Sequence, residues 1–192
     1  CETDFVAKDD SFNSFAAALT QLIVDQNPAD VESLSALIMD SGASVEAERQ
    51  ELIAKIGENI SIRRFETLVS GSGQISGYMH GTRIGVLVSA SGAAELGRDL
   101  AMHIAASRPV CIGEADMPSD VLTREREIYT AQAAESGKSP EIVEKMVDGR
   151  VKKFLKENTL LGQPFVKNPD ISVAELLSQG NASMDGMLRF EV

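Results

Sequence analysis

The sequence lacks tryptophan, and aromatic residues make up only 5% of its 192 positions. It carries two cysteines, Cys1 and Cys111, with no CxxC motif and no Cys/His spacing that suits zinc. No apolar run approaches the ~20 residues that cross a bilayer, and the first residues show no signal-peptide pattern. These absences exclude a disulfide scaffold, a structural zinc module and a helical membrane protein. We therefore expect a cytoplasmic protein with free thiols, in which Cys111 is a buried small side chain.

Positive charge is scarce as well. The chain has 18 Lys and Arg against 29 Asp and Glu, which gives a net charge of −11. Binding to nucleic acid or to an anionic membrane depends on basic side chains that neutralise phosphates, so this balance argues against both as direct partners. An acidic surface suits a protein partner, or it serves only solubility.

The sequence does contain many hydrophobic residues at helical spacing, and they make up 43% of the chain. That content supports one large domain or two small ones. The first predicted helix begins at Asp10 or Ser11, either of which can cap it, and another starts after Ser44 and ends at Gly57. The same signals predict helices over 11–28, 30–40, 45–57, 94–107, 119–136, 140–157 and 172–180.

Strand signals lie between and after these helices. Stretches rich in β-formers, partly alternating between apolar and polar residues, predict strands, with a glycine-rich turn at 70–73. The predicted strands cover 60–69, 74–81, 82–91 and 187–192.

Together these elements predict an α+β fold of two tandem, similar subdomains, each a small antiparallel sheet with helices. We place the N-terminal core subdomain at 1–69 and the C-terminal core subdomain at 70–192. A short linker predicts an antiparallel helical hairpin, or coiled coil, inserted at 119–157. The chain is expected to begin inside the last strand of the first subdomain, whose earlier strands are missing.

No group of residues assembles into an active site. The glycine-rich stretch 71–77 lacks the Gly-Lys-Ser/Thr ending of a phosphate loop and lies between two predicted strands. Acidic residues near the N-terminus lack the spacing of a calcium loop. His103, on a predicted helix, is expected to be a partly buried structural ring with a backbone partner. We therefore expect no catalytic residue, no metal ion and no cofactor.

Two residues fit a binding surface as well as a structural role. Phe5 follows Asp4 and does not continue the apolar stripe of the first helix. It either packs inward, as a strand residue or a hydrophobic staple, or it is an exposed aromatic anchor for a partner. His80 ends a predicted strand next to a glycine, and we give equal weight to its lying in a turn and to its lying at a binding surface. Composition leaves both choices open.

Six motifs follow one another along the chain: "CETDFVAKDDSF", "LIAKIGENISIRRFE", "GYMHGTRIGVLV", "LAMHIAASRP", "EKMVDGRVKKF" and "GQPFV". Together, and in this order, they resemble the bacterial elongation factor Ts family. The resemblance covers the family's core, which consists of two α+β subdomains and an inserted antiparallel coiled coil. It does not extend to the family's N-terminal helical module, its preceding strand or its C-terminal helical tail, so we expect a truncated form.

The resemblance implies a guanine-nucleotide exchange factor for elongation factor Tu in translation elongation, with no bond chemistry of its own. In the family, the Asp-Phe pair of the TDFV motif contacts the GTPase domain. The phenylalanine wedges in near the nucleotide and disturbs the magnesium and phosphate contacts. The positions that match the family's partner contacts are Asp4, Phe5, Ile56, Gly57, His80 and Val166.

The resemblance also implies an alternative. The coiled coil contributes to dimer contacts in some members of the family, so residues 119–157 would form a homodimer. In that case the truncated form would be a dimerisation or interaction module without exchange activity.

Overall fold

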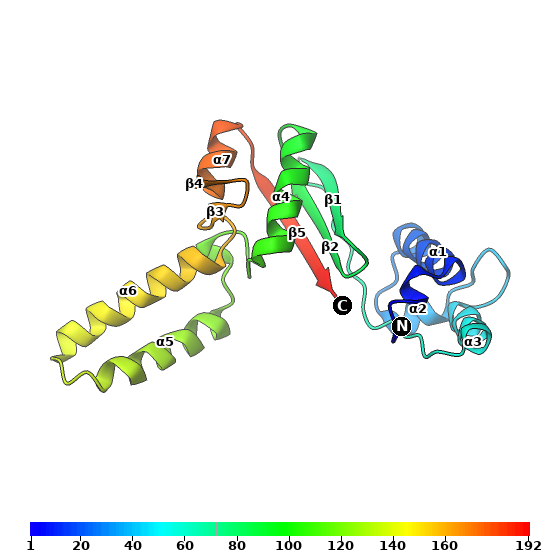
Figure 1. Cartoon of the computed structure of the whole chain (residues 1–192), viewed down its shortest axis with the longest axis horizontal. Helices are drawn as coiled ribbons and strands as arrows, with labels where there is room; N and C mark the ends of the chain where they lie inside the picture. The colour runs from blue at the N-terminus through cyan, green and yellow to red at the C-terminus, as the bar shows by residue number, and fades with distance from the viewer. Residues whose placement is uncertain (72) are drawn as a thin grey trace. The chain divides into compact units, whose positions relative to one another are not determined.

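The computed structural model describes residues 1–71 and 73–192 of the chain. It contains two compact units, Cys1–Thr67 and Leu68–Val192, which we describe one at a time. Helices predominate, and the strands form small antiparallel sheets (Figure 1), which confirms the predicted α+β class. The predicted turn at 70–73 includes Ser72, which lies outside the described residues.

The first unit packs short helices around a small apolar core. α1 (Asp10–Gln26) and α3 (Val45–Ile56) occupy their predicted positions, whereas α2 (Val31–Ala36) ends earlier than predicted. The reason is local: the backbone turns extended at the residue after α2, and Ile38 then pairs with Ser44 in an isolated bridge. The buried core residues of this unit are Val6, Phe15, Met39, Val45, Leu52 and Ile60.

Specific side chains fix the ends of these helices. Asp9, and not Asp10 or Ser11, caps α1, because Asp9 has the extended backbone of a cap residue and Asp10 is already helical. The Asp9 carboxylate accepts a hydrogen bond from the Ser11 N–H at 2.8 Å. Ser44 caps α3 as predicted, and α3 ends at Gly57, whose φ of 82° favours glycine.

The predicted strand at 60–69 is wrong. Its residues form no ladder with any described segment. Ile60 is buried and Ile62 packs beside the same core, so the apolar alternation reflects side-chain burial without strand pairing. The start of the chain, predicted as the end of a strand, instead forms a 3₁₀ turn, η1 (Val6–Lys8). The sheet expected in the first subdomain is therefore not found among residues 1–67.

The second unit is organised around an antiparallel sheet of order β1-β2-β5. β1 (Gln74–His80) and β2 (Ile84–Ala90) form the predicted hairpin, and β5 (Met184–Glu191) pairs with the other edge of β2. α4 (Ala94–Ser107) packs against β1 and β2 (Figure 1). The buried core residues are Val86, Val88, Ala90, Leu100, Ala101, Ile104, Ala105, Leu160, Phe165, Val173 and Leu177.

A helical hairpin follows α4 in the chain. Cys111 lies before it and is buried, as predicted, and burial raises the pKa of its thiol. After the 3₁₀ turn η2 (Glu114–Asp116), α5 (Ser119–Ala134) and α6 (Pro140–Asn158) run as the two arms (Figure 1). The residues buried between the arms are Ala133, Val147 and Val151.

A small sheet connects the hairpin to the last helix. β3 (Pro164–Phe165) pairs with β4 (Asn168–Ser172). α7 (Val173–Gln179) begins with the predicted capping box, in which Ser172 and Glu175 satisfy each other's backbone N–H groups. No helix in the described part of the chain is long and apolar enough to cross a membrane.

Candidate functional site

Phe5 is the most exposed large hydrophobic residue among those described, with 88% of its surface accessible. Its neighbour Val6 is buried in the core of the first unit. The 3₁₀ turn explains this opposition: the Lys8 N–H donates to the Phe5 carbonyl and the Asp9 N–H donates to the Val6 carbonyl, which turns one side chain inward and the other outward. The interpretation that the Phe5 side chain packs inward is therefore wrong.

Glu58 anchors the segment that carries Phe5. Its carboxylate accepts hydrogen bonds from the Thr3 N–H at 2.7 Å, from Thr3 Oγ1 at 2.6 Å and from the Glu2 N–H. These bonds, led by that of the Thr3 side chain, hold the pKa of Glu58 below its usual 4.5. Because Glu58 follows Gly57, the anchor ties the chain start to the end of α3.

The end of α3 supplies the next two predicted contact residues. Ile56 is half-buried and packs beside the core of the first unit, and Gly57 is exposed. The Gly57 N–H donates to the Ile53 carbonyl at 2.8 Å, which closes the helix. Open space surrounds the position that a Cβ of Gly57 would take. The structure thus brings the segment of Phe5 and the Ile56–Gly57 corner together within one unit.

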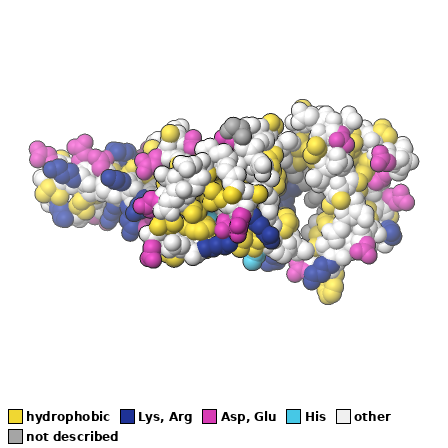
Figure 2. All heavy atoms as spheres, turned by 90° about the horizontal axis from the view of Figure 1, so that it is seen from above, with side chains coloured by type: hydrophobic (Ala, Val, Ile, Leu, Met, Phe, Trp, Pro, Cys, Tyr) yellow, Lys and Arg dark blue, Asp and Glu magenta, His cyan; other side chains and the backbone are white. Residues whose placement is uncertain are grey.

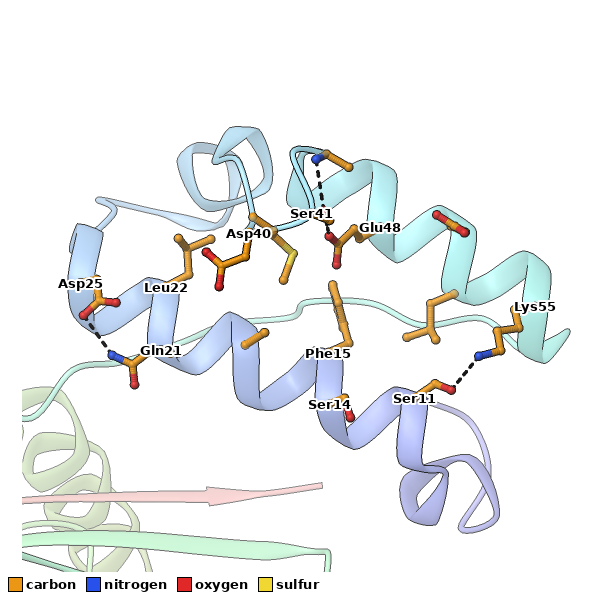
Figure 3. A pocket seen from close by; sticks show the side chains of 15 residues that line it. Ser11, Ser14, Phe15, Gln21, Leu22, Asp25, Asp40, Ser41, Glu48 and Lys55 are labelled. Atoms are coloured by element: carbon orange, nitrogen blue, oxygen red, sulfur yellow. Dashed lines mark hydrogen bonds between the residues drawn. The ribbon is translucent and has the colours of Figure 1, made fainter.

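A groove lies between α1 and α3, and Lys55, the residue before Ile56, lines it (Figure 3). It has a volume of about 980 Å³, a floor that includes Phe15 and Leu52, and a rim rich in carboxylates. At one end Lys55 Nζ donates to Ser11 Oγ at 2.9 Å, which links the two helices where the chain enters α1. The lining contains no histidine or cysteine. Among the described residues no cluster of metal-ligating side chains occurs either.

His80 is exposed at the end of β1, in the second unit. Tyr78 Oη lies 3.1 Å from His80 Nδ1, within hydrogen-bond distance, and the two rings are tilted with centroids 6.2 Å apart. Gly81 then turns the chain with a φ of 59°. Tyr78 therefore orients a histidine whose other ring nitrogen has no protein partner among the described hydrogen bonds.

Val166 lies in the turn between β3 and β4 and is 47% exposed. Its backbone N–H donates to His103 Nδ1 at 3.2 Å. The next residue, Lys167, forms an ion pair of 2.6 Å with Asp99. Both partners belong to α4, so this helix holds the turn that carries Val166. No described hydrogen bond or ring contact joins Val166 to His80.

His103 itself is fully buried, whereas the sequence predicted a partly buried ring. The predicted backbone partner is confirmed, and it is the Val166 N–H. On the other side of the ring, His103 Nε2 lies 2.9 Å from Gln163 Oε1. Burial lowers the pKa of His103 from its usual 6.5, and the hydrogen bond with Gln163 offsets part of that shift.

Gln163 is the residue in this region that the sequence did not single out. It is 7% exposed, and its Nε2 donates to the carbonyls of Glu157 at 2.8 Å and Ser107 at 3.4 Å. It therefore joins the ends of α4 and α6 to the His103 ring. A glutamine in a loop belongs to no apolar period, so no pattern in the sequence marks it.

Charged side chains of both signs are mixed over the surface that Figure 2 shows. Lysines and arginines lie among acidic residues, and hydrophobic side chains appear between them. Nothing on that face forms a continuous basic surface of the kind that phosphate backbones require.

Comparisons with a family model and with known proteins both identify the same family. The family described as Elongation factor TS matches residues 2–192. The chain is 55% identical to the elongation factor Ts proteins of Thioalkalivibrio sulfidiphilus and Methylococcus capsulatus, over the whole chain and 66% of each relative. It is 52% identical to that of Chromobacterium violaceum, again over 66% of the relative. The chain thus spans about two thirds of the length of these relatives.

Proposed function

Since the chain belongs to the elongation factor Ts family, we propose that it promotes guanine-nucleotide exchange on elongation factor Tu during translation elongation. The observation that carries this proposal is the exposure of Phe5 on an anchored turn. The proposed contact surface comprises Asp4, Phe5, Ile56 and Gly57 in the first unit and His80 and Val166 in the second.

An exposed phenylalanine is a strong candidate for a binding anchor. Burying such a side chain on a partner contributes about 1.5–3 kcal/mol, and aromatic residues dominate many interfaces. Phe5 needs little reorganisation to bind, because η1 already presents it and Glu58 already fixes the preceding backbone. Ile56 and Gly57 directly precede Glu58, the residue that anchors this segment, and in the proposal they add to the contact.

Exchange follows from coupled binding. A GTPase holds its nucleotide through backbone amides around the phosphates and through Mg²⁺. If Phe5 binds best when these contacts are disturbed, this chain and the nucleotide weaken each other, and each such linkage is typically worth ~1–3 kcal/mol. Asp4 adds a negative charge beside the wedge. The chain forms and breaks no covalent bond in this scheme, so it needs no nucleophile or general base.

The second unit contributes a separate patch in the proposal. His80 and Val166 are both exposed, and each is held by a neighbouring side chain. Contacts to more than one part of the partner would raise affinity through effective concentration.

Release of fluorescent GDP from elongation factor Tu tests the proposal. The chain should accelerate release, and Phe5→Ala should reduce the acceleration by about tenfold or more. Val24→Ala is the matched control, because Val24 is another large hydrophobic residue of the first unit and is 64% exposed on α1. Full activity of Phe5→Ala would contradict the wedge, and no acceleration by the unsubstituted chain would contradict exchange activity.

Self-association through the hairpin is a second candidate function. Ile128 on α5 and Ile142 on α6 are 39% and 47% exposed, although the hairpin already has its own buried seam. Burying these two side chains against a second copy would be favourable, because it removes apolar surface from water. Sedimentation of the chain with Ile128→Ser and Ile142→Ser should show less dimer, whereas a monomeric unsubstituted chain would contradict this function.

A further inference from the structure

Both ring nitrogens of the buried His103 have partners, and this defines where its proton lies. The Val166 N–H can only donate, so His103 Nδ1 must accept and carries no proton. The proton therefore lies on Nε2, which donates to Gln163 Oε1. Gln163 is oriented to receive it, because its amide nitrogen already donates to the carbonyls of Glu157 and Ser107.

The position of the Val166 backbone is fixed more by its hydrogen bond to the His103 ring than by the pairing of β3 with β4. β3 is only two residues long, and its pairing with β4 shifts register between Pro164 and Phe165. Phe165 is buried in the core, with its ring centroid 5.9 Å from that of His103. Val166 follows directly and faces solvent. The hydrogen bond to His103 thus fixes the residue at which the chain leaves the core.

A second tether lies one helical turn away on α4. Asp99 precedes His103 by four residues, so the two side chains share one face of α4. Asp99 binds Lys167 in an ion pair of 2.6 Å, while His103 binds Val166. Successive turns of one helix therefore hold successive residues of the β3–β4 turn. The Asp99 pair is partly exposed and the His103 bond is shielded, so the latter carries more of the positional control.

From this geometry we infer that His103 is a positioning residue for partner binding: its Nδ1 holds the Val166 backbone so that the Val166 side chain projects as a preformed apolar contact. The inference rests on the proposed function, because it assigns a role within that contact surface. His103 does not touch the partner in this scheme and acts only through Val166.

Two substitutions of His103 test its two hydrogen bonds one at a time. In His103→Asn the carboxamide oxygen can take the place of Nδ1, which keeps the bond to Val166 and loses the one to Gln163. In His103→Gln the longer carboxamide reaches towards Nε2, which keeps Gln163 and frees Val166. A merely structural role predicts that both variants affect stability and that neither affects partner affinity selectively.

The experiment measures the equilibrium affinity of the full chain for elongation factor Tu with these variants and with Val166→Ala. We expect His103→Gln and Val166→Ala each to weaken binding by about tenfold, and His103→Asn to retain most of the affinity. The double variant His103→Gln/Val166→Ala should bind no more weakly than Val166→Ala alone, because the two residues act as one unit.

Amide hydrogen exchange at Val166 provides the second measurement and requires no partner. Protection of this amide should fall in His103→Gln and persist in His103→Asn. Equal protection in the two variants would overturn the inference, as would additive losses in the double variant or normal binding by Val166→Ala. If the unsubstituted chain does not bind elongation factor Tu, the proposed function fails as well. If the unsubstituted chain binds but the losses of His103→Gln and Val166→Ala add up in the double variant, only the positioning role of His103 is overturned, and the proposed function stands.

Discussion

Phe5 and Val166 are both proposed contact residues, but the two units present them by different means. Phe5 stands on a surface turn whose anchor, Glu58, is a carboxylate accessible to water. Val166 is held by the fully buried His103, which in turn depends on the buried amide of Gln163. Water competes with the first set of bonds and is excluded from the second. Substitutions around Phe5 should therefore change function with little effect on stability, whereas those around Val166 should change both.

The largest effect is expected from Gln163→Leu. This change removes the acceptor for His103 Nε2 and the donor to the carbonyls of Glu157 and Ser107, and it leaves these buried groups unpaired. We expect the second unit to lose about 2–4 kcal/mol of its free energy of unfolding, measured by urea titration. Gln74→Leu, at an exposed position of β1, is the control and should change stability by at most about 0.5 kcal/mol. An equally mild effect of Gln163→Leu would contradict the proposed importance of its buried bonds.

The next largest effect is expected from acidification, which should lower the free energy of unfolding of the two units over different pH ranges. Burial lowers the pKa of His103 below 6.5, so the unfolded chain takes up this proton at a higher pH than the folded one. The free energy of unfolding of the second unit should therefore decrease as the pH falls below about 6.5. Glu58 has a lowered pKa, so the stabilisation it gives to the first unit is lost only below its usual 4.5.

Urea titrations followed by NMR read each unit separately and check this difference. The decline between pH 6.5 and 4.5 should disappear from the second unit in His103→Asn, because the substituted side chain cannot take up this proton. Identical profiles for the unsubstituted chain and His103→Asn would assign the decline to another group.

The smallest effect on stability is expected from Glu58→Gln. The neutral amide weakens the bonds to Thr3 and Glu2, so the chain start should become less ordered while the helical core stays folded. Amide hydrogen exchange at Thr3 should accelerate, and GDP release should slow by about two- to fivefold. Glu51→Gln, at an exposed position of the preceding helix α3, is the matched control. Unchanged protection of the Thr3 amide would show that Glu58 does not anchor the segment.

Local signals in the sequence predicted most of the helices. Ser44 and Gly57 mark α3 correctly, because capping and left-handed backbone are set by single residue types. The apolar period of α4 likewise placed His103 on a buried face, and the sequence also predicted its backbone partner. The caps and the apolar period depend on neighbours within a few residues, whereas the backbone partner of His103 could be predicted only in kind, because Val166 lies 63 residues further along the chain.

Features that depend on distant partners were predicted less well. Residues 60–69 have a strand-like pattern, yet a strand exists only where another segment supplies its hydrogen bonds. Phe5 was assigned to the end of a strand because the two halves of the chain were expected to be similar, and the structure has a 3₁₀ turn there instead. Gln163 went unnoticed because its three partners come from segments 6 to 60 residues away.

The rate of GDP release at saturating concentrations of the chain tests the proposed wedge most directly. Stopped-flow titrations of elongation factor Tu with the unsubstituted chain and with Phe5→Ala separate the maximal release rate from the concentration needed for half of it. We expect Phe5→Ala to lower the maximal rate by about tenfold or more, because the side chain acts in the complex that contains nucleotide. An unchanged maximal rate with only a higher half-saturating concentration would show that Phe5 contributes affinity alone, and would contradict the wedge.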